Sequence, residues 1–306
     1  MEKITIVNKI NALKKQRNAV ILAHNYQLPE VQDIADFTGD SLDLSMKATK
    51  TDADIIIFCG VDFMAESAKI LNPEKTVIIP DKDAKCPMAE MVDPESLNWV
   101  KRDHPNAEVV AYINTSAEVK AASDICCTSA NGVKIVQKCA SKEVIFIPDQ
   151  NLGKFIQRSV PEKQMILWPG MCPTHHNNIK KQDIIKLKKE HPLAEVLVHP
   201  ECRPEVIDIA DHAFSTSGML NYMGKTTAQE FIIGTEKEMC HRLQKENPEK
   251  KFYPVPLAVC PNMKRITLEK VLKSLETLEP KILLSSDIIK RAKIPLQRMM
   301  DMGRGD

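Results

Sequence analysis

The sequence has almost no excess of charge of either sign. It contains 42 basic and 41 acidic residues in a chain of 306. It therefore lacks the basic surface that nucleic acids or anionic lipids require, and it has no acidic tail. Any anionic ligand must be bound locally, by a few well-placed groups. With 43% hydrophobic and 27% charged residues, the chain otherwise has the composition of a globular protein with a sizeable core.

Long apolar stretches are also missing. No run approaches the ~18 residues of a membrane span, and the charged, amphipathic N-terminus lacks the apolar core of a signal peptide. We therefore expect a cytoplasmic protein. In that reducing compartment the nine cysteines are expected to be thiols or metal ligands and not a disulfide framework. Five have the pattern of buried structural thiols: Cys59, Cys126, Cys127, Cys139 and Cys240.

The chain contains an internal repeat. Three stretches align without gaps and begin at Val20, Glu108 and Glu195, so their offsets are 88 and 87 residues. Chance matches among common residues are the alternative, but five matched columns at one period, found twice, favour a true repeat. The columns are His24, Tyr112 and His199; Tyr26, Asn114 and Glu201; Glu30, Glu118 and Glu205; Asp36, Asp124 and Asp211; and Ser41, Ser129 and Thr216.

Each copy has the pattern of a strand, a turn and a helix, followed by another helix and further strands. The later strands are expected at 52–60 and 75–80, at 142–148 and 164–169, and at 229–235 and 251–256. Further helices are expected at 4–16, 93–105, 180–192 and 266–276.

Strands that alternate with helices indicate parallel sheets covered on both faces. We therefore predict an α/β fold of three three-layer α/β/α domains, related by a pseudo-threefold axis, around a central active site. The predicted units span residues 1–91, 92–178 and 179–266, and the C-terminal helices in 267–306 pack back onto them. Ligands of open α/β sheets bind beyond the carboxyl ends of the strands, where the aligned polar residues stand.

The strongest motif is a Cys-Pro pair that obeys the repeat. Cys86, Cys172 and Cys260 each follow the last strand of a copy and each precede a proline. Proline biases the preceding cysteine towards an extended backbone and removes one amide donor beside its sulfur. Three loop cysteines inherited from a duplicated ancestor are the alternative. If the copies surround an axis, the three thiolates can meet on it.

These spacings leave the identity of the metal open. A zinc ion could take His175 or His176 as a fourth ligand beside Cys172. A [4Fe–4S] cluster normally has four cysteines, so three would leave one iron open to act as a Lewis acid. No C-x-x-C run of the ferredoxin type is present, which makes electron transfer the weaker interpretation.

Ser41, Ser129 and Thr216 each stand just before an expected helix. Helix capping alone would explain any one of them. Three equivalent helix N-termini at one cavity would instead form an anion site, which predicts a substrate with several carboxylates or phosphates. Lys225 could add a positive charge, although a solvated surface lysine is the commoner case.

The candidate acid–base groups are His24, Tyr26, Tyr112, His175, His199 and Glu201. Glu201 is the preferred base, because burial near a metal is expected to raise the pKa of its carboxyl. The remaining histidines are assigned no chemistry: His104, His191, His212 and His241.

The motifs in combination resemble those of quinolinate synthase, from about Val20 to about Thr267. They are AHNYQ from Ala23, TGDSL from Thr38, YIN from Tyr112, CTSAN from Cys127, PGMCPTHH from Pro169, HPEC from His199, TSGM from Thr216 and CPNMK from Cys260.

The resemblance implies a transferase of NAD biosynthesis that condenses iminoaspartate with dihydroxyacetone phosphate, losing water and phosphate. It implies one [4Fe–4S] cluster on Cys86, Cys172 and Cys260, whose open iron coordinates the substrate. It also implies that a dicarboxylate is bound by His24, Ser41, Tyr112, Asn114, Ser129, His199, Glu201 and Thr216. Tyr26, Tyr112 and Glu201 would carry protons, and His175 and Lys225 match further active-site positions.

Two other functions are compatible with the residues alone. One is an iron–sulfur hydro-lyase of a hydroxy acid, which would share the three cysteines and the anion pocket. The other is a zinc-stabilised or redox-sensing protein without catalysis. The expected partners are the two small substrates and, for the unstable imine, the enzyme that supplies it; neither nucleic acid nor a membrane is expected.

Overall fold

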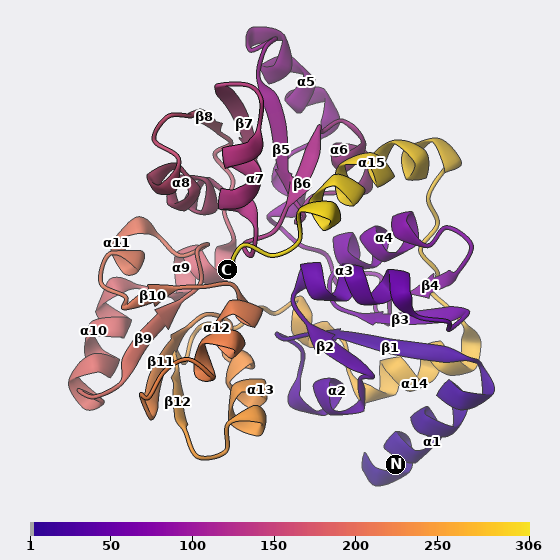
Figure 1. Ribbon diagram of the computed structural model, residues 1–306. Helices are drawn as coiled ribbons and strands as arrows, with labels where there is room; N and C mark the ends of the chain where they lie inside the picture. Colours follow the sequence, from indigo (N-terminus) through magenta and orange to yellow (C-terminus); the bar gives the residue numbers. More distant parts are fainter. Residues whose placement is uncertain (1–2) are drawn as a thin grey trace.

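The computed structural model describes residues 3–306, so Met1 and Glu2 of the predicted first unit lie outside the described residues. Three four-stranded parallel sheets surround a common centre (Figure 1), which confirms the predicted α/β class. The first sheet has the order β2-β1-β3-β4, the second β6-β5-β7-β8 and the third β10-β9-β11-β12. Each lies within one predicted unit; the unit boundaries themselves stay a prediction.

The strands are β1 (Ala19–His24), β2 (Phe37–Gly39), β3 (Ile55–Cys59), β4 (Thr76–Ile78), β5 (Glu108–Tyr112), β6 (Ile125–Cys127), β7 (Glu143–Ile147), β8 (Gln164–Leu167), β9 (Glu195–Val198), β10 (His212–Ala213), β11 (Glu230–Gly234) and β12 (Lys251–Pro254). The edge strands β2, β6 and β10 were missing from the prediction. They have only two or three residues, too few for an alternating pattern.

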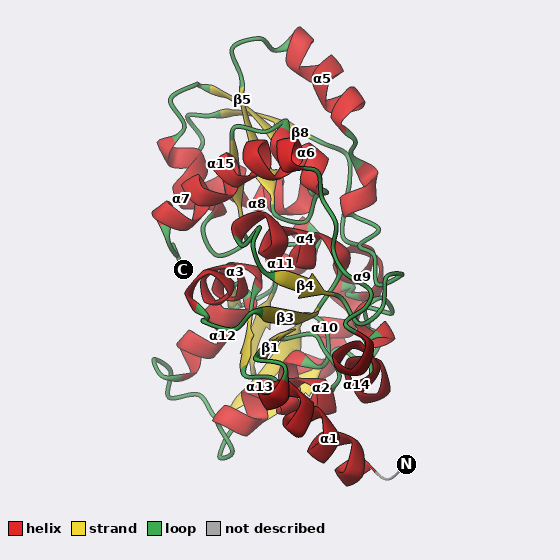
Figure 2. Cartoon of the chain, turned by 90° about the vertical axis from the view of Figure 1, so that its right-hand side faces the viewer, coloured by secondary structure: helices red, strands yellow, loops and turns green. Residues whose placement is uncertain are grey.

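Helices flank the sheets, as the side view in Figure 2 shows. They are α1 (Lys3–Gln16), α2 (Pro29–Ile34), α3 (Ser41–Lys50), α4 (Asp62–Leu71), α5 (Pro94–Asp103), α6 (Ala117–Ala121), α7 (Gly132–Lys138), α8 (Gln150–Ser159), α9 (Pro173–Asn178), α10 (Lys181–Glu190), α11 (Pro204–Ile207), α12 (Thr216–Met223), α13 (Met239–Glu246), α14 (Leu268–Thr277) and α15 (Ser286–Met302). Short 3₁₀ turns at Ala89–Met91 and Met263–Arg265 follow two of the Cys-Pro pairs.

The repeated aspartate has a structural role. The carboxylate of Asp36 accepts a hydrogen bond from the backbone N–H of Ile21 at 2.9 Å, while its own N–H donates to the carbonyl of Ile21. Asp124 and Asp211 make the same pair of bonds at the start of β5 and β9. The aspartate therefore fastens the entry of each edge strand to the first strand, and this explains one column of the repeat without any chemistry.

The C-terminal helices pack back onto the first two units. Helix α14 lies against α1 and β3, and α15 lies against α4, α6, β6 and α7. One continuous hydrophobic core includes Ile57, Val110 and Phe231, which belong to the three different sheets. The units are therefore joined by buried apolar surface as well as by the chain.

The last residues cross the centre of the molecule, where Figure 1 places the C-terminus. Arg304 donates from Nη1 to Oδ2 of Asp40 at 2.9 Å and from Nη2 to Oγ of Ser215 at 2.9 Å. The N–H of Gly305 donates to the carbonyl of Ala130 at 2.8 Å. These partners stand at the starts of α3, α12 and α7, one in each unit, so the tail 303–306 ties together three helix N-termini.

Replacing Arg304 by methionine should therefore destabilise the assembly. The change leaves the buried carboxylate of Asp40 without its cation, which is expected to lower the free energy of unfolding by about 2 kcal/mol. Arg291→Met removes an ion pair to Asp287 that is more than half exposed and should cost less than about 0.5 kcal/mol. Urea unfolding of both variants checks this, and equal losses would contradict the role given to the tail.

Candidate functional site

A cavity lies where the carboxyl ends of the three sheets meet. Three columns of the repeat line it, together with His175 and all three Cys-Pro cysteines. The columns are His24, Tyr112 and His199; Tyr26, Asn114 and Glu201; and Ser41, Ser129 and Thr216. Parallel strands end at the same edge, so β1, β5 and β9 deliver the residues that follow them to one place. The structure thus brings together every predicted site residue except Lys225 and the alternative zinc ligand His176, whose Nδ1 lies 2.9 Å from Nδ2 of Asn151.

Lys225 lies elsewhere. It is exposed in the turn after α12, where its backbone N–H donates to the carbonyl of Tyr222, and it is absent from the cavity wall. Nine residues beyond Thr216, the chain has already left the cavity along α12. The geometry gives Lys225 no contact through which it could act there.

Ser41, Ser129 and Thr216 are not needed as helix caps. The caps of α3 and α12 are the preceding residues Asp40 and Ser215, which accept hydrogen bonds from Asp43 and Gly218, and α7 begins only three residues after Ser129. All three hydroxyl residues line the cavity. Oγ1 of Thr216 accepts from Nδ2 of Asn25 at 2.7 Å, and Oγ of Ser129 lies 3.1 Å from Nε2 of His199, so the hydroxyls belong to the polar wall beside the positive ends of helices.

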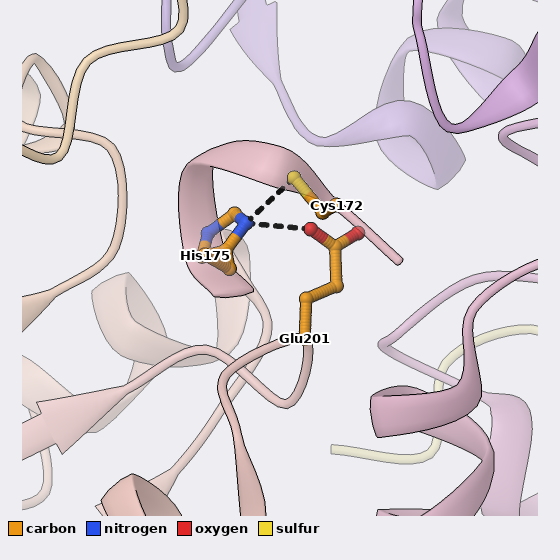
Figure 3. A group of neighbouring side chains, drawn as sticks. All are labelled: Cys172, His175 and Glu201. Atoms are coloured by element: carbon orange, nitrogen blue, oxygen red, sulfur yellow. Dashed lines mark hydrogen bonds and ion pairs between the residues drawn. The ribbon is translucent and has the colours of Figure 1, made fainter. Parts of the chain in front are cut away.

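Glu201 is the buried centre of the site. Its side chain extends from the loop after β9 towards Cys172 and His175 (Figure 3). Tyr112 donates to its Oε1 at 2.5 Å, and Nδ1 of His175 lies 2.6 Å from its Oε2. Burial alone would raise the pKa of this carboxyl, but the neighbouring His175 and the hydrogen bonds from His175 and Tyr112 outweigh burial and lower it. The expected raised pKa is therefore wrong, and the resting group is a carboxylate.

A chain of hydrogen bonds connects the two tyrosines of the site. The hydroxyl of Thr235 lies 2.5 Å from Oη of Tyr26 and 2.8 Å from Nε2 of His175. With the proton of His175 on Nδ1, Tyr26 donates to Thr235, Thr235 donates to Nε2 of His175, and Nδ1 of His175 donates to Glu201. Tyr112 donates to the other oxygen of Glu201. The arrangement can move a proton across the cavity.

Burial holds two histidines and two tyrosines of the site neutral. Burial lowers the pKa of His24 to about 3 and that of His199 to about 3. Burial and the charge of Glu201 raise the pKa of Tyr26 and Tyr112 far above that of a free phenol. At neutral pH these four side chains can donate or accept hydrogen bonds without adding charge.

The three Cys-Pro cysteines line the same cavity. Burial raises the pKa of each thiol, and the neighbouring sulfurs Cys86 and Cys260 add to the rise at Cys172. Backbone N–H groups two or three residues further on oppose this rise by hydrogen bonding to each sulfur. Such donors suit thiolates that are compensated by bound metal.

The remaining cysteines line no part of this cavity, and all nine are free. Four of the five predicted structural thiols are buried and Cys240 is partly buried. Cys202 is a further buried thiol, and its sulfur donates to the carbonyl of Gly234.

A second metal arrangement overlaps the first. One ligand atom each from Cys172, His175 and Glu201 lie within 4.8 Å of one another, so this group could hold a single ion. Its sulfur, nitrogen and carboxylate donors are a set that zinc accepts. This set shares Cys172 and His175 with the zinc site expected from the sequence, but its third ligand is Glu201 and not another Cys-Pro cysteine.

One buried polar atom of the wall has no partner. Oδ1 of Asn114 is enclosed and accepts no hydrogen bond from any described residue. Unpaired buried acceptors are costly in a folded protein, so this atom is expected to bind a donor group of a ligand.

Sequence reasoning missed four buried or half-buried residues of the site. Thr235 carries no motif signal. Asp62, Asp149 and Glu236 accept hydrogen bonds from the backbone N–H groups of the three Cys-Pro cysteines. Their spacing of 87 residues, from 62 to 149 and from 149 to 236, matches the repeat and could have identified them.

Known proteins share this chain's sequence over almost its full length. The family model described as quinolinate synthetase A protein matches residues 8–301. The quinolinate synthase of Thermodesulfovibrio yellowstonii is 56% identical over 298 residues, which are 97% of this chain and 98% of the relative. Those of Methanosarcina barkeri and Geobacter metallireducens are each 52% identical, over 98% and 99% of this chain and 98% and 100% of their own lengths.

The neutral histidines should make the metal-free protein sensitive to acid. In the unfolded chain the pKa of each histidine is 6.5, whereas in the folded protein the pKa of His24 and of His199 is about 3. The unfolded chain therefore binds more protons than the folded protein below pH 6.5, and the free energy of unfolding falls as the pH drops. Each should cost about 2 kcal/mol between pH 6.5 and about pH 5. Urea unfolding at both pH values should show that His24→Asn removes roughly half of this loss, with His104→Asn as control. An unchanged loss in His24→Asn would contradict the assignment.

Proposed function

This chain belongs to the quinolinate synthetase A family, and from that premise we propose how its cavity makes quinolinate. The family match and the curated relatives favour this synthesis over a hydro-lyase or a non-catalytic metal protein. The reaction joins iminoaspartate to dihydroxyacetone phosphate with loss of phosphate and water. As a condensation it places the enzyme among the transferases.

The cavity suits these anionic substrates. Ser41, Ser129 and Thr216 would bind the carboxylates of iminoaspartate, with α3 and α12 presenting their positive ends to the same groups. Oδ1 of Asn114, which has no other partner, would accept a hydrogen bond from the imine or hydroxyl hydrogens. His24 and His199 would hydrogen-bond to the substrate as neutral imidazoles. They would add no positive charge, so the helix N-termini would be the groups that attract the anionic substrate.

One observation carries the proposal of a [4Fe–4S] cluster. Of nine cysteines, the three that line the cavity are Cys86, Cys172 and Cys260, one from each repeat. They would hold three irons, and the cluster would supply a Lewis-acidic fourth iron that polarises a carbonyl or hydroxyl oxygen of the substrate. Their N–H donors to sulfur fit this use.

Glu201 is proposed as the base. It is already a carboxylate, so it can take a proton from a substrate carbon on Oε1 once Tyr112 turns its hydroxyl to the substrate. His175 would hold the other oxygen in place, and Tyr26 could return a proton through Thr235 and His175. Burial of all these groups excludes water from the reactive imine.

The location and partners complete the proposal. None of the helices between residues 3 and 306 combines the length and apolarity that crossing a membrane requires. We propose that the enzyme works in the cytoplasm with its two small substrates, and that it receives the unstable imine from the enzyme that forms it. The cavity wall does not include Lys225, so a catalytic role for this residue stays a prediction from the family resemblance.

Anaerobic protein should form quinolinate from dihydroxyacetone phosphate and iminoaspartate generated from oxaloacetate and ammonium. Glu201→Gln keeps the size of the side chain but removes its charge and basicity, and it should lower kcat about 100-fold or more with the iron content unchanged. Product detection by liquid chromatography checks both. No quinolinate from iron-loaded wild-type protein would refute the proposed function, and an unaltered rate in Glu201→Gln would exclude this base.

Each cavity cysteine should be required for metal loading. Cys86→Ala, Cys172→Ala and Cys260→Ala each remove one of three ligands and should lose most of the iron that anaerobic reconstitution supplies. Cys139→Ala, which removes a buried thiol outside the cavity, should load like the wild type. Iron and sulfide analysis decides the matter, since equal loading in all four variants would disprove the ligand assignment.

A further inference from the structure

A carboxylate holds the backbone of each Cys-Pro cysteine. The N–H of Cys86 donates to Oδ1 of Asp62 at 3.3 Å, and that of Cys172 donates to Oδ2 of Asp149 at 3.1 Å. The N–H of Cys260 donates to Oε1 of Glu236 at 3.3 Å. The same contact therefore occurs three times, once in each repeat.

The sheet topology explains why these pairs meet. Strands β3, β7 and β11 pair in parallel with β4, β8 and β12, so the carboxyl ends of each pair are neighbours. The carboxylates follow the inner strands by two or three residues, whereas the cysteines stand in the loops after the outer strands. Backbone N–H groups at Asp62, Gln150 and Lys237 already donate to carbonyls of the cysteine loops, and each carboxylate adds a side-chain bond to the cysteine itself.

The carboxylates are themselves anchored at helix starts. Asp149 caps α8 by accepting on Oδ1 from the N–H groups of Asn151 and Leu152, which leaves Oδ2 for Cys172. Glu236 accepts on Oε2 from the N–H of Glu238 just before α13 and forms an ion pair with Lys264 at 2.8 Å. Asp149 and Glu236 are fully buried.

Asp62 is only half-buried and differs in one respect. It is the first residue of α4, and its Oδ1 alone accepts from the N–H groups of both Phe63 and Cys86. An amide oxygen at this position can keep both bonds, whereas Asp149 uses its two oxygens for two different tasks. This difference makes the pair a test of what the carboxylates do.

We propose that Asp62, Asp149 and Glu236 are positioning residues that fix the three ligand loops so that their sulfurs point at one metal group. This rests on the proposed function, in which the cysteines hold the cluster. Groups that orient metal ligands typically change metal affinity about 10- to 100-fold when they are removed. Loosening one loop should release iron without removing a ligand.

The test compares amide variants of the anaerobically reconstituted protein. Asp149→Asn must place an NH₂ group against either the cap or the N–H of Cys172, and it should lose iron to a chelator about 10-fold faster than the wild type. Asp62→Asn keeps its acceptor and should lose iron more slowly than Asp149→Asn. Asp93→Asn, at the cap of α5 and remote from any cysteine contact, is the matched control and should behave like the wild type.

The EPR spectrum of the reduced cluster separates positioning from general weakening. It should change in Asp149→Asn and stay unchanged in Asp93→Asn, because only the first alters a ligand loop. If Asp149→Asn fails to fold, Asp149→Ser replaces it, since serine keeps a helix cap but offers one oxygen instead of two. Asp93→Ser is then the control.

The outcomes are distinct. Iron release at the wild-type rate from Asp149→Asn or Asp149→Ser, with an unchanged spectrum, would overturn the positioning role. Equally fast release from Asp62→Asn and Asp149→Asn would also overturn it, by assigning the effect to charge and not to the N–H bond. Wild-type protein that never takes up iron would instead refute the proposed function.

Discussion

Parallel pairing of strands is the constraint on which the rest of the structure depends. Because every strand of a sheet ends at the same edge, the loops that carry polar residues all leave from that edge. Three such sheets around one centre direct these loops into a single cavity (Figure 1). The repeat therefore gives each unit the same set of parts: a polar residue after the first strand, a hydroxyl at the next helix, a carboxylate after the third strand and a cysteine after the fourth.

The same repeat gives the cavity its asymmetry. Equivalent positions hold His24, Tyr112 and His199 in one column and Tyr26, Asn114 and Glu201 in another. The third unit supplies Glu201, the carboxylate that Tyr112 and His175 contact from the second unit. The lowered pKa of Glu201 keeps it a carboxylate among neutral imidazoles and phenols, while the helix N-termini supply positive partial charge for an anionic ligand. Function thus arises from divergence at positions that the fold keeps equivalent.

Much of this was accessible from the sequence, because it depends on local pattern and on the repeat. The parallel α/β class, the long strands and the convergence of the cysteines follow from periodicity and spacing. The edge strands were missed because two or three residues carry no period. The lowered pKa of Glu201 depends on Tyr112, 89 residues away, and on His175, so neighbouring sequence cannot reveal it. Lys225 lies outside the cavity wall, which its distance of nine residues from Thr216 cannot reveal, because that distance does not show where the helix leads. Asp62, Asp149 and Glu236 were overlooked although they obey the repeat.

The central claim is that cysteines from three repeats hold one iron–sulfur group, and not that Cys172, His175 and Glu201 bind a lone ion. Anomalous diffraction from anaerobically grown crystals, with data collected at the iron and zinc absorption edges, tests it most directly. We expect an iron signal in the cavity within bonding distance of the sulfurs of Cys86, Cys172 and Cys260. A zinc signal alone, bound by Cys172, His175 and Glu201, would contradict it.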